Sequence, residues 1–267
     1  MSPRLTFAID VAIQGGLSTL AHFQAGREIE LKSDDSPVTV ADREAERAMR
    51  AAIARAYPGE AILGEEEGSS GEGDSRWVLD PIDGTKSFVS GVPLYATLVA
   101  WESEREPVIG VCFLPALGEL IYAERGSGAL WVPFGRLPEK PSAEAVAKIA
   151  EPAKVGEAAE IAGAIVSSGS MTSMARADRL KGFQILEGKA MAARTWSDAY
   201  GHALVATGRI AAMIDPIVAR WDVSAMAVIV REAGGRFTDF RGLDELAEEA
   251  ISSNGLVHEE VLEAFRR

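Results

Sequence analysis

The residues best suited to chemistry lie where a short apolar run leads into Asp80-Pro-Ile-Asp83-Gly-Thr85. Two carboxylates three residues apart around a Pro-Ile turn can converge on one point. Gly84 lets the backbone approach a ligand closely, and the N–H groups at a helix start near Thr85 form a site for an anion. A cation cluster beside an anion site is what phosphoryl transfer needs, because its catalysis rests on positioning and charge neutralisation.

Two further acidic positions strengthen this interpretation. Glu65 follows a predicted buried strand, and Asp222 opens a predicted apolar helix. Each has a plain alternative, since an Asp-Gly turn, a surface charge and a helix cap are common uses of acidic residues. Together with Asp80 and Asp83 they offer oxygen ligands that suit a hard cation. Because these segments contain no His or Cys, the set favours Mg²⁺ or Mn²⁺ over Zn²⁺.

The elements that must position these residues are predicted from periodicity and turn signals. Apolar side chains at helical spacing predict a helix over 5–24, and Thr39 is the expected N-cap of a second helix with Asp42 in its first turn. Residues 64–75 are expected to form a polar, Gly-rich loop. Short strands are expected at 61–63 and 77–79, and strands with the rhythm of an antiparallel sheet at 94–102, 107–114, 118–124 and 128–132.

Strands and helices alternate in the second part of the chain, beyond a Pro-, Glu- and Lys-rich stretch at 136–157. We expect one α+β unit spanning 1–267, with an N-terminal half of about 1–135 and a C-terminal half of about 136–267. The expected strands are 162–167, 183–186, 210–215 and 249–253. The expected helices are 172–181, 196–206, 222–233 and 257–265.

Charge and composition restrict the class of partner. Lys and Arg number 27 against 40 Asp and Glu, so the net charge is −13 and binding to nucleic acid is not expected. The single cysteine, Cys112, excludes an internal disulfide and a Cys-rich zinc site. We expect no membrane span, because no apolar run approaches ~20 residues. Asp10 and Gln14 interrupt any signal-peptide core, so a cytoplasmic protein is expected.

Three ordered motifs resemble the inositol monophosphatase family of Mg²⁺-dependent, lithium-sensitive phosphatases. They are Gly64-Glu65-Glu66, Asp80-Pro-Ile-Asp83-Gly-Thr85, and Trp221-Asp222 followed by Glu232-Ala-Gly-Gly235. The resemblance extends from about residue 5 to residue 265. It implies the layered αβαβα sandwich of the inositol monophosphatase and fructose-1,6-bisphosphatase type, and a homodimer.

The resemblance also implies metal ligands. Glu65, Asp80 and the backbone carbonyl of Ile82 would bind a first Mg²⁺, and Asp80, Asp83 and Asp222 a second. Glu65 would help to hold a weaker third ion, and Mn²⁺ could replace Mg²⁺. We therefore expect bound cations to neutralise part of the net negative charge locally.

Catalytic roles follow from the same resemblance. Glu65 and Thr85 would orient an attacking water, and the N–H groups of Gly84 and Thr85 would contact the phosphate. Asp42 would act through metal-bound water with support from Thr39. The expected reaction is in-line displacement at a small phosphorylated metabolite, with the cations activating water and stabilising the leaving oxygen.

The substrate is predicted from other positions. Thr85-Lys-Ser-Phe88 with a following Gly-x-Pro resembles the histidinol-phosphate phosphatase branch, and the segment from Arg194 to Gly208 indicates the same. Asp198 could pair with the ammonium of an amino-alcohol phosphate. Asp215 matches the family's substrate-contacting acid, and Lys32 matches a family position near the acidic site. Asp198 could instead cap a helix, and Arg194 could serve an ion pair or a dimer interface.

Other functions stay open at this point. An inositol-1-phosphate or broad sugar-phosphate monophosphatase is the main alternative. A 3′-phosphoadenosine nucleotide phosphatase is disfavoured by Ser87, because that branch tends to have Glu there. A non-catalytic, metal-binding regulatory protein is disfavoured because Glu65 and Thr85, which a decayed site would tend to lose, are both present.

Overall fold

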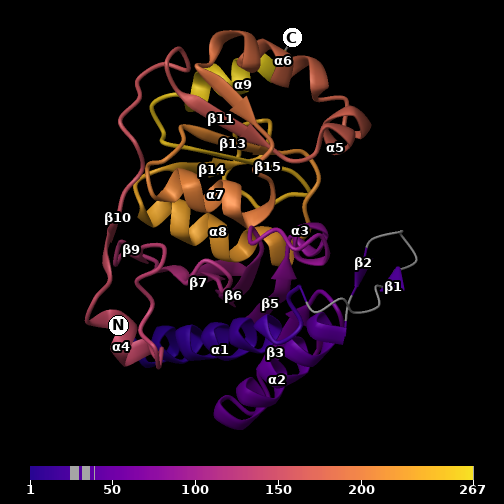
Figure 1. The fold of residues 1–267 in the computed structure, drawn as a ribbon, viewed down its shortest axis with the longest axis vertical. Helices are drawn as coiled ribbons and strands as arrows, with labels where there is room; N and C mark the ends of the chain where they lie inside the picture. The colour runs from indigo at the N-terminus through magenta and orange to yellow at the C-terminus, as the bar shows by residue number, and fades with distance from the viewer. Residues whose placement is uncertain (25–29, 32–36, 39, 267) are drawn as a thin grey trace.

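The computed structural model describes residues 1–24, 30–31, 37–38 and 40–266 as five stacked layers (Figure 1). Two helices cover one face of an eight-stranded sheet, two more lie between this sheet and a five-stranded sheet, and a last group of helices covers the far side. This confirms the predicted αβαβα sandwich. None of the described helices has the length and apolar character needed to cross a bilayer.

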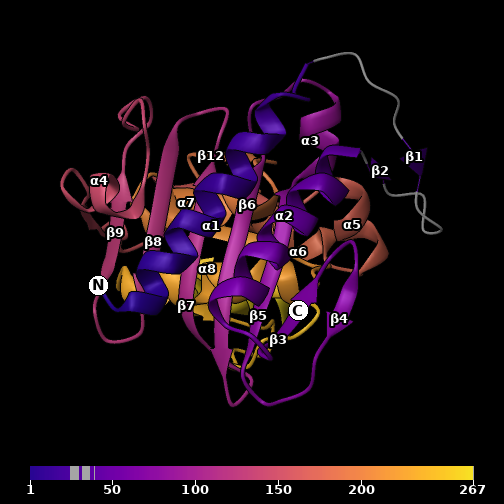
Figure 2. The same ribbon diagram turned by 90° about the horizontal axis from the view of Figure 1, so that it is seen from below.

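The first layer consists of α1 (Pro3–Leu20) and α2 (Val40–Ala56), which lie side by side across the sheet (Figure 2). Helix α1 begins at Pro3 because Ser2 caps it: the Ser2 hydroxyl accepts a hydrogen bond from the N–H of Leu5 at 3.1 Å. The two helices and the sheet enclose an apolar core that includes Ile9, Met49, Trp77 and Phe113.

The eight-stranded sheet has the order β10-β9-β8-β7-β6-β5-β3-β4 and is antiparallel except where β3 pairs with β5. The sheet packs against helix α8 (Arg220–Glu232) of the middle layer, which contacts β5, β6 and β7. The strands are β3 (Ala61–Gly64), β4 (Gly68–Ser70), β5 (Arg76–Asp83), β6 (Ala96–Ser103), β7 (Glu106–Leu114), β8 (Glu119–Glu124), β9 (Ala129–Val132) and β10 (Glu151–Ala153).

The middle layer is formed by α7 (Asp198–Ala206) and α8 (Arg220–Glu232). Their apolar faces meet the first sheet and the second sheet, so α8 is buried along most of its length. The second sheet has the order β12-β11-β13-β15-β14. Its strands are β11 (Ile165–Ser168), β12 (Ala192–Arg194), β13 (Ala212–Asp215), β14 (Arg236–Thr238) and β15 (Ala250–Ser253).

The remaining elements are helices at the surface and one small sheet. Helices α6 (Leu180–Lys189) and α9 (His258–Phe265) lie beyond the second sheet, and α5 (Met171–Arg176) lies beside it, as Figure 1 shows. Short helices α3 (Thr85–Val89) and α4 (Ala143–Ala147) follow β5 and β9, and β1 (Glu30–Leu31) pairs with β2 (Pro37–Val38).

Three local predictions were wrong. The expected loop 64–75 contains β4, which pairs with β3 and forms an edge of the sheet. The expected strand 183–186 lies inside helix α6, because its apolar residues pack against one face of the second sheet together with α9. The expected helix 172–181 is interrupted, because α5 ends at Arg176 and α6 begins at Leu180. The stretch 136–157 contains α4 and β10, and β10 pairs with β9 and extends the first sheet.

Close packing of α8 on β7 leads to a stability prediction. A Cβ at Gly110 would lie 2.2 Å from the carbonyl oxygen of Ala225 in α8, a backbone atom that cannot rotate away. Gly110→Ala should therefore cost about 1–3 kcal/mol through overpacking, or roughly 2–4 °C of melting temperature per kcal/mol. Thermal unfolding followed by circular dichroism measures this loss.

The matched control is Gly188→Ala in α6. Gly188 is exposed and a Cβ there meets no atom within 4 Å, so the better helix propensity of alanine should raise stability by up to about 1 kcal/mol. An unchanged melting temperature in Gly110→Ala would contradict the close packing of α8 on the sheet.

Candidate active site

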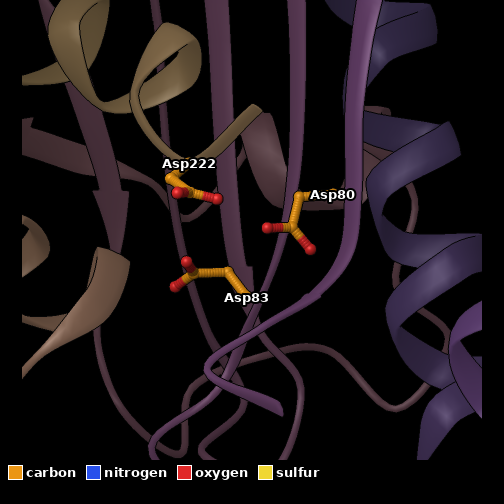
Figure 3. A group of neighbouring side chains, drawn as sticks. All are labelled: Asp80, Asp83 and Asp222. Atoms are coloured by element: carbon orange, nitrogen blue, oxygen red, sulfur yellow. The ribbon is translucent and has the colours of Figure 1, made fainter. Parts of the chain in front are cut away.

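Three carboxylates from two distant segments meet at the edge of the middle layer. Asp80 and Asp83 belong to β5 and Asp222 to the first turn of α8, and one oxygen from each lies within 4.8 Å of the others. Figure 3 shows the three side chains gathered around a shared space. They form part of the wall of a cavity of about 160 Å³, which we call the acidic cavity; its lining residues are Glu65, Asp80, Ile82, Asp83, Gly84, Thr85, Lys86, Asp198 and Asp222.

A break in the pairing of β5 explains how Asp80 and Asp83 both reach this cavity. In a regular strand, residues three apart point to opposite faces. Here Asp80 pairs with Leu98 but Asp83 pairs with Ala96, so the register shifts between them. The shifted segment is held by two hydrogen bonds: Ile82 N–H donates to Asp80 Oδ1 at 3.0 Å, and the Thr97 hydroxyl donates to the Pro81 carbonyl at 2.8 Å.

Gly84 and Asp198 form the next part of the wall. Gly84 has φ 83°, and a Cβ there would lie 3.0 Å from Asp198 Oδ2, so the glycine both permits the turn and makes room for the carboxylate. Asp198 has φ 60°, an unusual conformation for a residue other than glycine. Its neighbour Ala199 donates its N–H to Asp83 Oδ2 at 2.7 Å, which joins the start of α7 to the end of β5.

The start of α8 is positioned by a buried carboxylate in β6. Glu102 accepts hydrogen bonds from Arg220 Nε at 2.7 Å and from the Ser224 hydroxyl at 2.8 Å, both in α8. Asp222 Oδ2 in turn accepts the Ala219 N–H at 2.7 Å. Asp222 therefore caps the helix and also faces the cavity, so the two interpretations of this residue are compatible.

The electrostatics of the acidic cavity favour either protonation of its carboxylates or a bound cation. Burial raises the pKa of Asp80 well above its usual value, and the neighbouring carboxylates of Glu65, Asp83 and Asp222 raise it further. Burial followed by the charge of Asp198 has the same effect on the pKa of Asp83. Like charges so close together favour protonation unless a cation neutralises them. An all-oxygen donor set fits Mg²⁺ or Mn²⁺.

Asp198 is in a different electrostatic position. Burial raises the pKa of its carboxyl, whereas a hydrogen bond from the Ser197 hydroxyl at 3.1 Å and the charge of Lys86 lower it. Among the described residues, no side-chain hydrogen bond caps the start of α7, so Asp198 does not act as a helix cap. Asp198 therefore faces the cavity with a partly compensated negative charge.

Other predicted site residues lie farther from the acidic cavity. Asp42 is buried in α2, and Asp215 is buried at the end of β13, where burial and then Asp198 raise the pKa of its carboxyl. Arg194 is exposed on β12 and donates to the Ala193 carbonyl at 2.7 Å. None of the three lines the acidic cavity. Lys32 and Thr39 lie outside the described residues.

Lys86 lines the cavity but was not predicted from the sequence as a residue that contacts a substrate. Lys86 is the only residue with a positively charged side chain among those described as lining the acidic cavity. Its place directly after Thr85, at the start of α3, could have identified it, because a side chain in the first turn after a glycine-containing turn lies beside the proposed anion site.

Comparison with known proteins extends over the whole chain. The sequence model of the inositol monophosphatase family matches residues 1–267. The histidinol-phosphatase of Chlorobaculum parvum is 37% identical over 270 residues, covering 99% of this chain and 97% of that protein. The histidinol-phosphatase of Mycobacterium tuberculosis is 38% identical over 236 residues, covering 88% and 86%. The solved structure of a Thermotoga maritima IMPase is similar at a TM-score of 0.86 and 32% identity, covering 99% and 97%.

The raised pKa of Asp222 predicts how the cation-free protein responds to pH. Burial raises this pKa to about 7, whereas an unfolded aspartate titrates near 3.9. The folded state therefore holds the proton more tightly, and this contribution to stability is complete below about pH 3.9 and lost as pH rises through about 7. We expect the melting temperature of the protein in EDTA to fall from about pH 5 to about pH 8.

The control is Asp222→Asn, which removes the titrating group and should show a smaller fall over the same range. A divalent cation replaces the proton as the neutralising charge, so added Mg²⁺ should raise the melting temperature of the unsubstituted protein more at about pH 8 than at about pH 5.5. Equal pH slopes for the two proteins in EDTA would contradict the assignment.

Proposed function

The chain belongs to the inositol monophosphatase family and is a phosphoric monoester hydrolase, and we propose that it hydrolyses L-histidinol phosphate with Mg²⁺ as its cofactor. The observation that carries the proposal is the acidic cavity itself, which combines a cation-binding oxygen cluster, the Gly84-Thr85 turn and a separate carboxylate, Asp198. The names of two relatives of high coverage support the choice of substrate.

The proposed cation ligands are the residues that already line the cavity. Asp80, Asp83 and Asp222 would hold one ion, and Glu65 with the Ile82 carbonyl would complete a second site around Asp80. When bound, Mg²⁺ supplies positive charge that acidifies water and neutralises developing negative charge on the phosphate and the leaving oxygen. Mn²⁺, which accepts the same oxygen ligands, would also be accepted.

The residues after Asp83 are assigned to the water and the phosphate. The Thr85 hydroxyl donates its proton to the Ile82 carbonyl at 3.1 Å. Its lone pairs are thereby left to accept a hydrogen bond from the attacking water, and Glu65 would accept the second proton. Gly84 and Thr85 line the cavity, and their N–H groups would bind phosphate oxygens. Asp42 would support this set from α2 through an ordered water.

The substrate's ammonium group is assigned to Asp198. This carboxylate lines the same cavity as the cation ligands, so the phosphate and the amine of one small molecule could be bound at once. Lys86 would neutralise Asp198 before substrate enters and then turn to the phosphate. Asp215 is buried and close enough to Asp198 to feel its charge, and it would add negative charge that favours a cationic substrate.

A second candidate is hydrolysis of inositol 1-phosphate. It is favoured by the similarity to the Thermotoga maritima IMPase, which extends over 99% of the chain. Carboxylates at Asp198 and Asp215 can accept hydrogen bonds from ring hydroxyls as well as from an ammonium group. Family membership also leads us to propose a cytoplasmic homodimer.

The two substrates are separated by Asp198→Asn. A hydrogen bond to a charged group is worth about 1.5–3 kcal/mol, so kcat/KM for L-histidinol phosphate should fall roughly 10- to 150-fold. The value for inositol 1-phosphate should change much less, because it carries no ammonium group. Release of inorganic phosphate from both substrates at saturating Mg²⁺ measures the difference.

The matched control is Asp10→Asn, which alters a carboxylate on α1 that accepts the Ala143 N–H and does not line the acidic cavity. Asp10→Asn should leave kcat/KM unchanged for both substrates. Equal losses on the two substrates in Asp198→Asn would show that this residue does not select the amine.

The cation requirement is tested by Asp80→Asn. Asp80 is shared by both proposed cation sites, so phosphate release should fall by more than about 100-fold, beyond the usual effect of altering an outer partner of a ligand. Treatment of the unsubstituted enzyme with EDTA should abolish activity, and excess Mg²⁺ should restore it. Full activity of Asp80→Asn would overturn the metal-dependent mechanism.

A further inference from the structure

Glu46 is a carboxylate outside the acidic cavity that contacts the turn carrying Glu65. Glu46 belongs to α2 and its side chain is fully buried. Oε2 accepts the N–H of Glu66 at 2.8 Å, and Oε1 accepts the N–H of Glu67 at 3.1 Å. Helix α2 is thereby joined to the turn between β3 and β4.

These hydrogen bonds act on the backbone beside Glu65. On the preceding side, the N–H of Glu65 donates to the Leu79 carbonyl at 3.2 Å, next to Asp80. On the following side, the next two N–H groups donate to Glu46. The peptide groups on both sides of Glu65 are therefore held, one by strand β5 and the other by Glu46. The direction of the Glu65 side chain depends on both anchors.

An arginine makes the burial of Glu46 tolerable. Arg50, one helical turn later, donates from Nε to Glu46 Oε1 at 2.7 Å and from Nη1 to the Ser70 hydroxyl at 3.0 Å. Its Nη2 also donates to the Gly68 carbonyl. Because an unpaired buried carboxylate is costly, the ion pair offsets the burial of Glu46, and the further bonds of Arg50 connect α2 to β4.

The sequence of the turn is adapted to this arrangement. A Cβ at Gly64 would lie 2.2 Å from Glu46 Oε1, so only glycine lets the carboxylate approach the backbone this closely. Gly64 also pairs with Gly68 at the end of the β3–β4 hairpin. A carboxylate, an arginine and a glycine therefore converge on one short turn, whose cavity-facing residue is Glu65.

We propose that Glu46 is a positioning residue for cation binding: it holds the β3–β4 turn so that Glu65 can act as a ligand. This inference rests on the cation sites of the proposed function. The competing explanation is that Glu46 only anchors α2 to the sheet. The two differ in one respect, because an anchor affects global stability whereas a positioning residue also changes the affinity for the cation.

The experiment is Glu46→Gln, studied by calorimetric titration of the metal-free protein with Mn²⁺. An amide of the same shape cannot accept from both backbone N–H groups and from Arg50, so the turn should loosen without a change in volume. Altering a group that orients a metal ligand typically costs 10–100-fold in metal affinity. We expect a roughly 10- to 100-fold weaker Mn²⁺ affinity, the same shift in the Mg²⁺ concentration for half-maximal activity, and an unchanged KM at saturating Mg²⁺.

The matched control is Glu119→Gln. Glu119 is also buried and accepts from an arginine and a further N–H, Arg209 and the Trp131 indole. It begins β8, which β6 and β7 separate from β5. We expect Glu119→Gln to lose thermal stability but to keep the Mn²⁺ affinity of the unsubstituted protein.

Arg50→Met is the second variant, in case Glu46→Gln does not fold. Arg50 is the ion-pair partner of Glu46, and its own side chain is partly exposed. Its replacement should also weaken Mn²⁺ binding. Unchanged Mn²⁺ affinity in both folded variants, or an equal shift in Glu119→Gln, would overturn the role of Glu46. If the unsubstituted protein itself bound no Mn²⁺, the cation sites of the proposed function would fail instead.

Discussion

Repulsion between buried carboxylates is the constraint on which the active site depends. Asp80, Asp83 and Asp222 offer oxygens within 4.8 Å of one another, and burial with mutual repulsion raises the pKa of each carboxyl. Without a cation, this arrangement is tolerated only by holding protons. The same property would favour the binding of a divalent ion, because an ion would remove both the repulsion and the cost of burying charge.

The fold must supply the energy that keeps these groups together. Strand β5 is held on both sides by neighbouring strands, and α8 is buried between two sheets. The apolar contacts of this middle layer include Leu98, Met226 and Ile229. Because the hydrophobic contacts lie along the whole helix while the acids lie at its first turn, packing can offset local electrostatic strain at the cavity.

Three buried glutamates outside the acidic cavity show how different the cavity is. Glu46 is paired with Arg50, Glu102 with Arg76 and Arg220, and Glu119 with Arg209. Each of these acids has an arginine partner and connects elements that are distant in sequence. Among the described cavity-lining residues, the acids have only Lys86 as a counter-charge. Ion pairs therefore connect the elements that surround the cavity. The negative charge of the cavity's own acids is only partly neutralised by Lys86, and a cation and a substrate could neutralise the rest.

Much of the chemistry could be predicted from the sequence. Residue type alone fixes the donors: carboxylates without His or Cys indicate a hard cation, and a glycine followed by a helix start indicates an anion site. The alternation of predicted helices and strands indicated stacked helix and sheet layers, and the resemblance to the inositol monophosphatase family supplied the αβαβα order. The motifs around Glu65, Asp80 and Asp222 therefore determined the reaction class before any contact was known.

Tertiary structure decided the features that depend on pairing between distant segments. The Pro-Ile pair predicted that Asp80 and Asp83 converge, but the register shift that turns both to one side is set by the pairing of β5 with β6. Residues 183–186 form a helix because of packing against the second sheet. Glu46 is an ordinary helix residue in sequence, and it contacts the Glu65 turn only because α2 crosses that end of the sheet. Sequence determines which groups are present, whereas three-dimensional packing determines which of them meet, because burial and distance set the energy of each charge.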